Sequence, residues 1–228
     1  SPVPVQVGSG IPTKIRDYVY CLPFNDFDAV EQCLNDHHGE IAALLVEPCL
    51  GNIVGIEPKD GFLQHLRNLC DKYNVVLIFD EVKTGFRLSN GGARETYEVI
   101  PDISTYAKSL GNGVPVAAFG GKSEVMNVIG GGSVAHAGTF GGNGVSMSAA
   151  NAVLDILNEA PVLKELSIRG QKLKKGMDNI LEEVGIPHQM CGHPNIQGFL
   201  ITEHKVEEVR DLALSLIHIS EPTRRYRI

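Results

Sequence analysis

The sequence lacks an apolar run long enough to cross a membrane. Its longest runs, at residues 41–46 and 75–79, are far shorter than the roughly 20 residues that a transmembrane helix needs. The opening Ser-Pro-Val-Pro-Val has neither the basic start nor the apolar core of a signal peptide, so none is expected. These absences argue against a membrane protein and favour a cytoplasmic one.

Metal-binding and disulfide patterns are also missing. The five cysteines are odd in number and widely spaced, with no Cys-x-x-Cys pair and no histidine at metal-ligand spacing. The eight histidines form no metal motif either. We therefore expect no metal site, and buried free thiols in a reducing compartment.

There is no excess of basic residues. The formal charge is −7 and the two signs are interspersed, which argues against a nucleic-acid partner. The hydrophobic fraction of 43% and charged fraction of 21% are ordinary for a globular protein, and no internal repeat is evident. A length of 228 residues suits one large domain or a domain and a half.

Hydrophobic periodicity indicates an α/β fold. Residues 26–36 have helical spacing with Asp26 placed to cap the helix. A buried strand at 41–46, an amphipathic helix at 62–73 and a second buried strand at 75–79 then form the signature of a βαβ unit.

The second half of the chain continues with a strand, three helices and a final strand. A glycine-rich segment at 130–144 separates the first helix from the second. The pattern places these elements at 114–119, 123–129, from about 145, 162–184 and 198–202.

Two strand ends carry residues that suit one kind of chemistry. Asp80 follows the apolar strand Val75–Phe79, and Lys108 follows a second short run and precedes a Gly-Asn-Gly loop. Ligands of open α/β sheets lie beyond the carboxyl ends of the strands, so both side chains should face one crevice. A lysine can hold pyridoxal phosphate as a Schiff base while an acid keeps its ring nitrogen protonated.

Two other enzyme classes fit less well. An apolar strand ending in Asp-Glu also resembles the magnesium-binding strand of a P-loop nucleotidase, and Gly120 to Ser123 offers a partial phosphate loop. That loop has Val116 where the first glycine is needed, and it follows the Asp-Glu strand instead of preceding it. The glycines at 130–132 and 141–144 lack the spacing and setting of a dinucleotide-binding loop.

A non-catalytic relative that uses the fold for binding is a third alternative. The joint presence of Asp80 and Lys108 argues against it, since a binding module has no use for that pair.

Four motifs in order resemble one enzyme family. They are VEPCLGN at 46–52, LIFDEVKTGFR at 77–87, PDISTYAKSLGNG at 101–113 and HAGTFGGN at 136–143. Together they resemble the class III (subgroup II) pyridoxal-phosphate aminotransferases over roughly residues 10 to 205. Within that family the chain looks most similar to the glutamate-1-semialdehyde 2,1-aminomutase branch.

The resemblance implies a fold-type-I transferase. Members have a large α/β domain around a mixed, mainly parallel sheet of seven strands, plus a small α/β domain. They transfer an amino group between an amine or amino acid and an oxo compound, or exchange it within one molecule in the aminomutase branch. The resemblance also implies a homodimer with each active site at the subunit interface.

Residue roles follow from the same resemblance. Asp80 matches the acid that pairs with the ring nitrogen of pyridoxal 5′-phosphate, Lys108 the Schiff-base lysine, and Val82 the residue packed on one ring face. Asn52 matches an asparagine that approaches the ring hydroxyl. Gly138 and Thr139 match the pair that contacts the phosphate of the partner subunit's cofactor.

The extent of the chain departs from the family. Members carry a long portion ahead of the match, with a phosphate loop and a ring-stacking aromatic residue, so we expect an internal fragment that is inactive alone. We expect a partial large domain at 1–158, the start of a small domain at 159–213, and a non-native tail at 214–228. The tail resembles a translated sequencing adapter.

Overall fold

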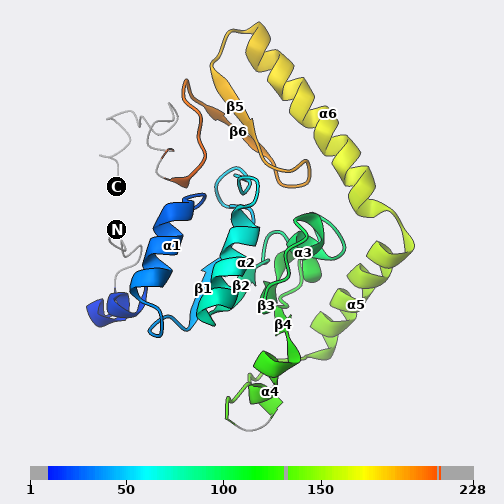
Figure 1. Ribbon diagram of the computed structural model, residues 1–228. Helices are drawn as coiled ribbons and strands as arrows, with labels where there is room; N and C mark the ends of the chain where they lie inside the picture. The colour runs from blue at the N-terminus through cyan, green and yellow to red at the C-terminus, as the bar shows by residue number, and fades with distance from the viewer. Residues whose placement is uncertain (1–9, 131–132, 210, 212–228) are drawn as a thin grey trace.

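The computed structural model describes residues 10–130, 133–209 and 211 (Figure 1). The expected adapter-derived tail at 214–228 lies outside the described residues. None of the described helices combines the length and the apolar character needed to span a bilayer.

A four-stranded sheet forms the centre of the described chain. Its strands are β1 (Ala43–Val46), β2 (Val76–Asp80), β3 (Ile103–Tyr106) and β4 (Ala118–Gly121), in the spatial order β1-β2-β3-β4. The first three strands are parallel, and β4 is antiparallel to β3. The predicted mixed, mainly parallel sheet is thus confirmed, and the strand ends of β1, β2 and β3 share one edge.

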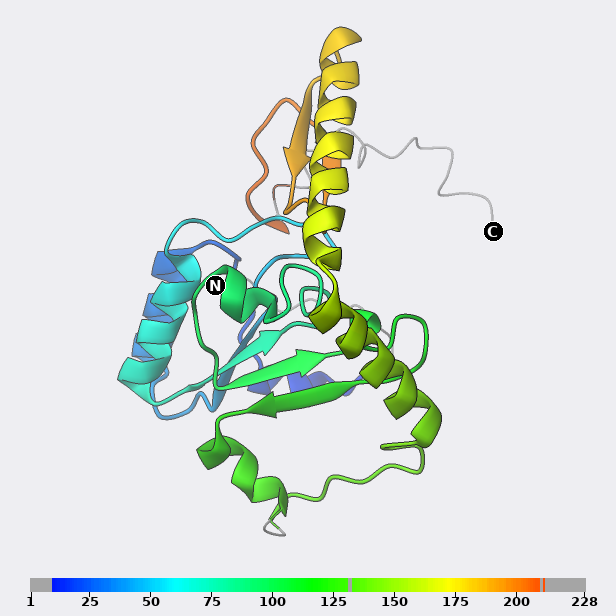
Figure 2. The same cartoon turned by 90° about the vertical axis from the view of Figure 1, so that its right-hand side faces the viewer.

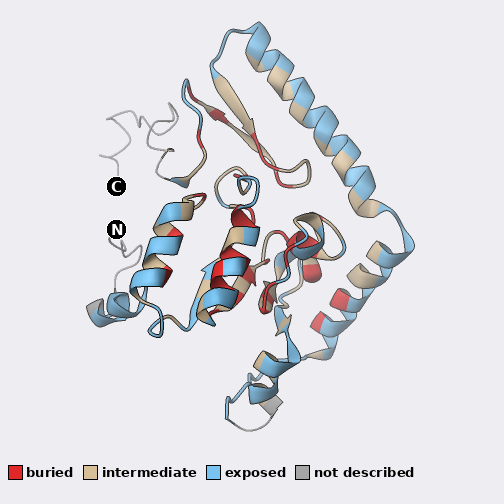
Figure 3. Cartoon of the chain, in the orientation of Figure 1, coloured by how far each residue is buried: buried red, intermediate tan, exposed pale blue. Residues whose placement is uncertain are grey.

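Two helices cover one side of the sheet. Helix α1 (Phe27–Asp36) begins as predicted, because Asp26 Oδ1 accepts a hydrogen bond from Ala29 N at 3.0 Å. Helix α2 (Phe62–Tyr73) packs beside it and ends at Asn74 in the left-handed conformation. Their inner faces are buried with β2, as Figure 3 shows, in a core that includes Leu66 and Phe79.

The remaining described helices are mostly exposed. They are η1 (Thr13–Tyr18), α3 (Gly92–Thr96), η2 (Lys108–Leu110), α4 (Ser123–Gly130), α5 (Gly144–Glu159) and α6 (Val162–Glu183). In Figures 1 and 2, α6 leads away from α5 and lies beside the hairpin of β5 (His188–Cys191) and β6 (Gly198–Ile201). Helix α6 has no buried residue although it carries apolar side chains.

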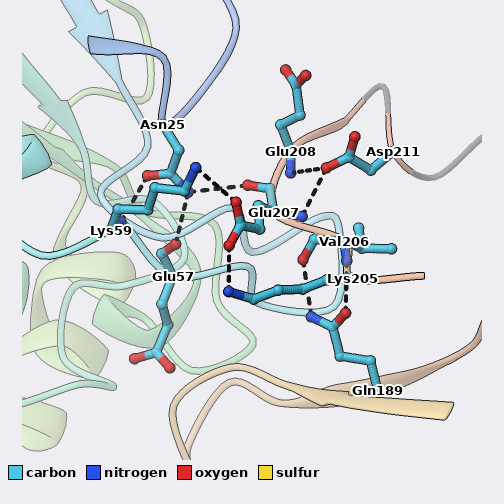
Figure 4. Close-up of polar contacts among 9 residues, drawn as sticks. All are labelled: Asn25, Glu57, Lys59, Gln189, Lys205, Val206, Glu207, Glu208 and Asp211. Carbon is cyan, nitrogen blue, oxygen red and sulfur yellow. Dashed lines mark hydrogen bonds and ion pairs between the residues drawn. The ribbon is translucent and has the colours of Figure 1, made fainter. Parts of the chain in front are cut away.

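Partly buried polar contacts join the segment after β6 to Asn25 and the segment at residues 57–59 (Figure 4). Asn25 Nδ2 donates to the carbonyls of Glu57 and Glu207 at 3.2 and 3.0 Å, and Asn25 Oδ1 accepts from Lys59 N at 2.7 Å. Lys59 Nζ also lies 2.7 Å from Glu207 Oε2. Both the amide nitrogen and the amide oxygen of the Asn25 side chain are therefore hydrogen-bonded to groups far away in the sequence.

One strand is shifted from its prediction, and other elements were not predicted. The strand expected at 114–119 is β4 at Ala118–Gly121, because pairing with β3 begins at Tyr106 opposite Ala118. Pro115, ahead of it, has no N–H for a ladder. The short helix α3 and strand β5 were not predicted, since neither has a clear periodic pattern.

Candidate active site

Asp80 lies at the carboxyl end of β2, half-buried and fixed in place. In the parallel register it is opposite Thr105 of β3. Asp80 Oδ1 accepts from Val82 N at 3.0 Å and from Thr105 Oγ1 at 3.3 Å. Oδ2 has no hydrogen-bond partner in the part of the chain that the structure describes. One oxygen thus orients the carboxylate and the other stays available.

Lys108 lies three positions beyond Thr105, at the start of η2. Its backbone has φ +40°, a conformation uncommon for a residue with a side chain. The side chain is exposed, and it makes no hydrogen bond or ion pair with any described residue. A cavity of about 420 Å³ lies elsewhere, against the first turn of α2, and contains neither Lys108 nor Asp80. The common crevice for these two residues stays a prediction.

Three contacts tie the loop after β2 to the end of β3 and the turn that follows it. Arg87 Nε donates to Ser109 Oγ at 2.5 Å, next to Lys108. The rings of Phe86 and Tyr106 lie 5.4 Å apart between centroids. Gly85 lies so close to Tyr106 that a Cβ there would be 2.6 Å from the ring. The loops that carry Asp80 and Lys108 are therefore packed as one unit.

Several non-glycine residues with positive φ lie at this edge of the sheet, whereas Asn74 and Glu98 lie ahead of β2 and β3 at the opposite edge. Val54, Phe86 and Lys108 have φ of +46°, +58° and +40°, and each lies in a loop that follows one of the three parallel strands. Left-handed conformations are unfavourable for such side chains, above all for β-branched valine. Strain of this kind is concentrated at functional sites in proteins, where the surrounding structure holds it.

Asn52 follows β1 and contacts the loop after β2. Its Oδ1 accepts a hydrogen bond from Lys83 Nζ. Gly51 N donates to Glu47 Oε2 at 3.1 Å, which ties this turn to the end of β1. Asn52 is exposed, and Val82 is half-buried beside Asp80. The structure thus brings Asn52 to the loop of Asp80 and Val82.

Gly138 and Thr139 lie in the exposed segment between α4 and α5. Gly138 O accepts from Gly141 N at 3.0 Å in a turn ahead of α5. Thr139 is exposed. Its contact with a phosphate stays a prediction.

The loop after β2 also contains a buried acid. Glu81 is fully buried and accepts from Ala93 N at 2.6 Å and from the hydroxyls of Thr84 and Ser104, both at 3.4 Å. Burial raises the pKa of Glu81, and these three donors act in the opposite direction. Glu81 therefore anchors the loop from within, while its neighbour Asp80 faces the site edge.

Comparison with known proteins decides the family. The family model described as aminotransferase class-III matches residues 17–218. This chain belongs to the class III aminotransferases. Curated relatives of the family include the glutamate-1-semialdehyde 2,1-aminomutases of Thermodesulfovibrio yellowstonii, 43% identical over 78% of this chain, and of Aquifex aeolicus, 41% identical over 86%.

Solved structures of transaminases share the fold. An omega-transaminase from Sphaerobacter thermophilus aligns with a TM-score of 0.86 and 34% identity, over 95% of this chain and 50% of that chain. A β-phenylalanine aminotransferase from Variovorax paradoxus aligns with a TM-score of 0.77 and 32% identity, over 84% and 45%. The described chain is thus part of a fold-type-I transferase.

The chain spans less than half the length of the curated aminotransferase relatives it matches. The alignments cover 42% of the Thermodesulfovibrio protein and 47% of the Aquifex protein. Within the described residues, no group of three His, Cys, Asp or Glu side chains could hold a metal ion.

Sequence reasoning missed the residues that support the candidate site. Thr105, Ser109 and Arg87 position the loops, and Lys83 contacts Asn52. Thr105 could have been found only from the β2–β3 register, which a single sequence does not reveal. Lys83 lies three residues beyond Asp80, and its motif position was the one available signal.

Proposed function

We propose that this chain carries the acid and the lysine of a pyridoxal 5′-phosphate-dependent aminotransferase. The enzyme would transfer an amino group between an amine or amino acid and an oxo compound. Family membership supports the reaction class, and one solved relative at 25% identity is described as a transaminase with PLP bound.

The single observation that carries this proposal is that Asp80 and Lys108 both keep a polar atom without a partner among the described residues. Asp80 is oriented through Oδ1 and keeps Oδ2 open, and Lys108 has no partner among the described residues. A carboxylate with one open oxygen can accept from a ring N–H, and an unpaired amine is available for covalent attachment. The donor set therefore fits pyridoxal 5′-phosphate.

Each residue has a distinct proposed role. When bound, pyridoxal 5′-phosphate supplies an aldehyde carbon and a ring that withdraws electrons when its nitrogen is protonated. Asp80 would keep the proton on that nitrogen, and Lys108 would attach the cofactor and later move a proton at its Nζ. Val82 would pack on a ring face, and Asn52 would approach the ring hydroxyl.

A homodimer would complete the site. Gly138 and Thr139 would contact the phosphate of the partner subunit's cofactor, which is consistent with their exposure here. Exposed amides and a hydroxyl at a turn before a helix suit an anion. A small molecule would be the substrate, with no nucleic acid or membrane as partner.

The domain division and the location belong to the same proposal. Residues 1–158 would form part of the large cofactor-binding domain and 159–213 the start of the small domain. Helix α5 ends at Glu159 and α6 begins at Val162, which supports a boundary there. All five cysteines are free, which supports a cytoplasmic location.

Borohydride reduction tests the proposed function. In the full-length protein that carries this chain, reduction followed by peptide mapping should find the cofactor fixed to Lys108. Attachment at Lys83 or Lys122 would refute the assignment. A spectrum without cofactor absorbance near the visible edge would instead favour a non-catalytic binding protein.

A glutamate-1-semialdehyde 2,1-aminomutase is the second candidate. Relatives at 40–43% identity carry that name, although solved structures at 32–34% are transaminases. The two reactions would use the same Asp80 and Lys108. A single-turnover experiment separates them, because a transaminase releases an oxo product whereas an aminomutase returns the amino group to the same molecule.

A further inference from the structure

The turn between β5 and β6, residues 192–197, packs backbone against backbone on two other segments of the chain. A Cβ at Gly170 of α6 would overlap Pro194 O, and a Cβ at Gly55 in the loop after β1 would overlap Ile196 O. Only glycine permits approaches this close. The turn is therefore seated tightly against both α6 and the loop after β1.

Asn195 adds a third contact from the same turn. Its Nδ2 donates to Arg87 O in the loop after β2 at 2.7 Å, and to Leu163 O at the start of α6 at 3.4 Å. Both partners are carbonyl oxygens, so only the amide nitrogen can face them. Asn195 Oδ1 is buried and has no hydrogen-bond partner among the residues that the structure describes. Asn195 is thus held through its donors, and Arg87 lies 108 positions away from it in the sequence.

Arg87 connects this turn to Lys108. Its backbone oxygen accepts from Asn195, and its side-chain Nε donates to Ser109 Oγ at 2.5 Å. Ser109 directly follows Lys108, whose backbone has φ +40°. A strained conformation of this kind persists only where the surrounding contacts hold it. Two successive hydrogen bonds therefore lead from the β5–β6 turn to the neighbour of the strained lysine.

We infer that Asn195 is a positioning residue of the proposed active site, and that it holds Lys108 in place through Arg87 and Ser109. The inference rests on the proposed function, in which Lys108 attaches the cofactor. All the other proposed site residues lie in the proposed large domain. Asn195 gives the proposed small domain a part in the same site.

Hydrogen exchange in the full-length protein without cofactor tests this connection. The amides at residues 110–112 donate to the carbonyls of Ala107 and Lys108, so their exchange reports whether that turn is held. Asn195→Ala should speed exchange at these amides by about fivefold, as expected for the loss of one hydrogen bond. Asn195→Asp keeps the size of the side chain without its N–H donor, and it serves in place of the alanine variant if that variant does not fold.

Gln197→Ala is the matched control from the same turn. Gln197 Nε2 donates to Gly170 O of α6 at 2.9 Å, so this variant also loses one bond from a side-chain amide to a backbone carbonyl. It keeps the contact between Asn195 and Arg87, and exchange at residues 110–112 should match that of the wild type. Equal exchange at these amides in the Asn195 and Gln197 variants overturns the inference.

Kinetics of the full-length holoenzyme test the consequence for the reaction. Asn195→Ala should lower kcat about tenfold and leave KM nearly unchanged, because a misplaced Lys108 slows proton movement without altering substrate contacts. Ser109→Ala should act in the same way, and the double variant should lose little more than either single one, since both act through Arg87. Losses that multiply in the double variant contradict a shared route and overturn the inference.

Failure of this inference is distinguishable from failure of the proposed function. Peptide mapping of the reduced wild type reports whether the cofactor is attached to Lys108. Exchange at residues 110–112 needs no cofactor, so it reports the connection to Asn195 whatever that mapping finds.

Discussion

The Asp80 carboxylate has one oxygen, Oδ1, held by hydrogen bonds, and a second, Oδ2, without a partner among the described residues. This arrangement matters for catalysis. The hydrogen bonds from Val82 N and Thr105 Oγ1 both end on Oδ1, so the carboxylate cannot rotate freely. A charge that is held in place before reaction stabilises a transition state without paying for its own reorganisation.

Asp80→Asn should therefore keep the cofactor attached to Lys108 but remove most activity in the full-length protein. The amide cannot hold the ring nitrogen protonated, and loss of one preorganised electrostatic group costs on the order of 10²–10³ in kcat. Steady-state kinetics and the absorbance spectrum measure the two effects. Activity within a few-fold of wild type would show that Asp80 is not the partner of the nitrogen.

Asp102 is a second acid whose surroundings determine its charge. It lies just ahead of β3 and is buried. Its oxygens accept from Lys122 Nζ at 2.7 Å, Leu77 N at 2.7 Å and Arg67 Nη1 at 2.9 Å. Burial raises the pKa of Asp102, but these three donors outweigh burial, so the pKa lies below its ordinary value.

This shift predicts how acid affects folding. A carboxyl group with a lowered pKa stabilises the fold above the ordinary value of about 3.9, and that contribution is lost as the pH falls through the folded-state pKa. Asp102→Asn should lower the free energy of unfolding at neutral pH by about 3 kcal/mol, because Arg67 loses its buried partner. The variant should also lack this part of the acid sensitivity.

Urea denaturation of the chain at pH 3 to 7 measures both effects. Asp155→Asn serves as the matched control, since Asp155 is exposed on α5 and should change the unfolding free energy by less than about 0.5 kcal/mol. Equal acid sensitivity in Asp102→Asn and wild type would contradict the assigned shift.

Helix α3 and the loop after β2 are held together at Gly92. This glycine has φ +69°, and a Cβ there would lie 2.2 Å from Glu81 Oε2, the oxygen that accepts from Ala93 N. Since Glu81 is buried, its carboxylate has little room to move aside. The loop conformation that carries Asp80 thus depends on a residue without a side chain twelve positions beyond Asp80.

Gly92→Ala should destabilise the chain more than Gly61→Ala, its matched control. Gly61 also has a left-handed φ, of +79°, but a Cβ there meets nothing within 4 Å. Backbone strain alone should cost about 1–2 kcal/mol at either position. Displacing Glu81 from Ala93 N should add about 1–3 kcal/mol at Gly92. Thermal or denaturant unfolding checks this, and equal losses would mean that Glu81 adjusts without cost.

At the scale of the whole molecule, several large apolar side chains on different elements are exposed. Leu45 on β1 is 65% exposed, Val145 on α5 is 74% exposed and Ile180 on α6 is 61% exposed. Parallel sheets in α/β proteins are normally covered on both faces. Exposure of this extent is typical of surfaces that pack against further protein.

A mixed-dimer experiment tests the proposed interface site in the full-length protein. Lys108→Ala and Thr139→Asp should each be inactive alone, the first without an attachment point and the second with a charge that repels phosphate. Refolded together, they should regain roughly a quarter of wild-type activity, because half the dimers would pair one native Lys108 with one native Thr139. No recovery, with both variants folded and mixed, would place Thr139 and Lys108 in the same subunit's site.

Much of the fold follows from local patterns in this sequence. Asp26 caps α1, α2 spans its predicted residues, and Asp80 ends a predicted strand, because capping and hydrophobic periodicity depend on neighbouring residues. The predicted burial of the strands is only partly correct, since β2 alternates buried and half-buried residues and β1 alternates exposed and half-buried ones. The motifs around Asp80 and Lys108 likewise identified the family that the comparison found. These features involve interactions over a few residues, so a single sequence records them.

Only the tertiary structure decided which distant residues meet. Three contacts join segments that are separate in the sequence: Thr105 bonds to Asp80 across two strands, Lys83 packs on Gly51, and Glu81 packs against Gly92. Each depends on strand register and loop path, which follow from the sum of many weak contacts across the sheet. The motifs indicated Asp80 and Lys108 as candidate site residues, whereas the residues that hold their loops could not be predicted, because those contacts exist only after folding.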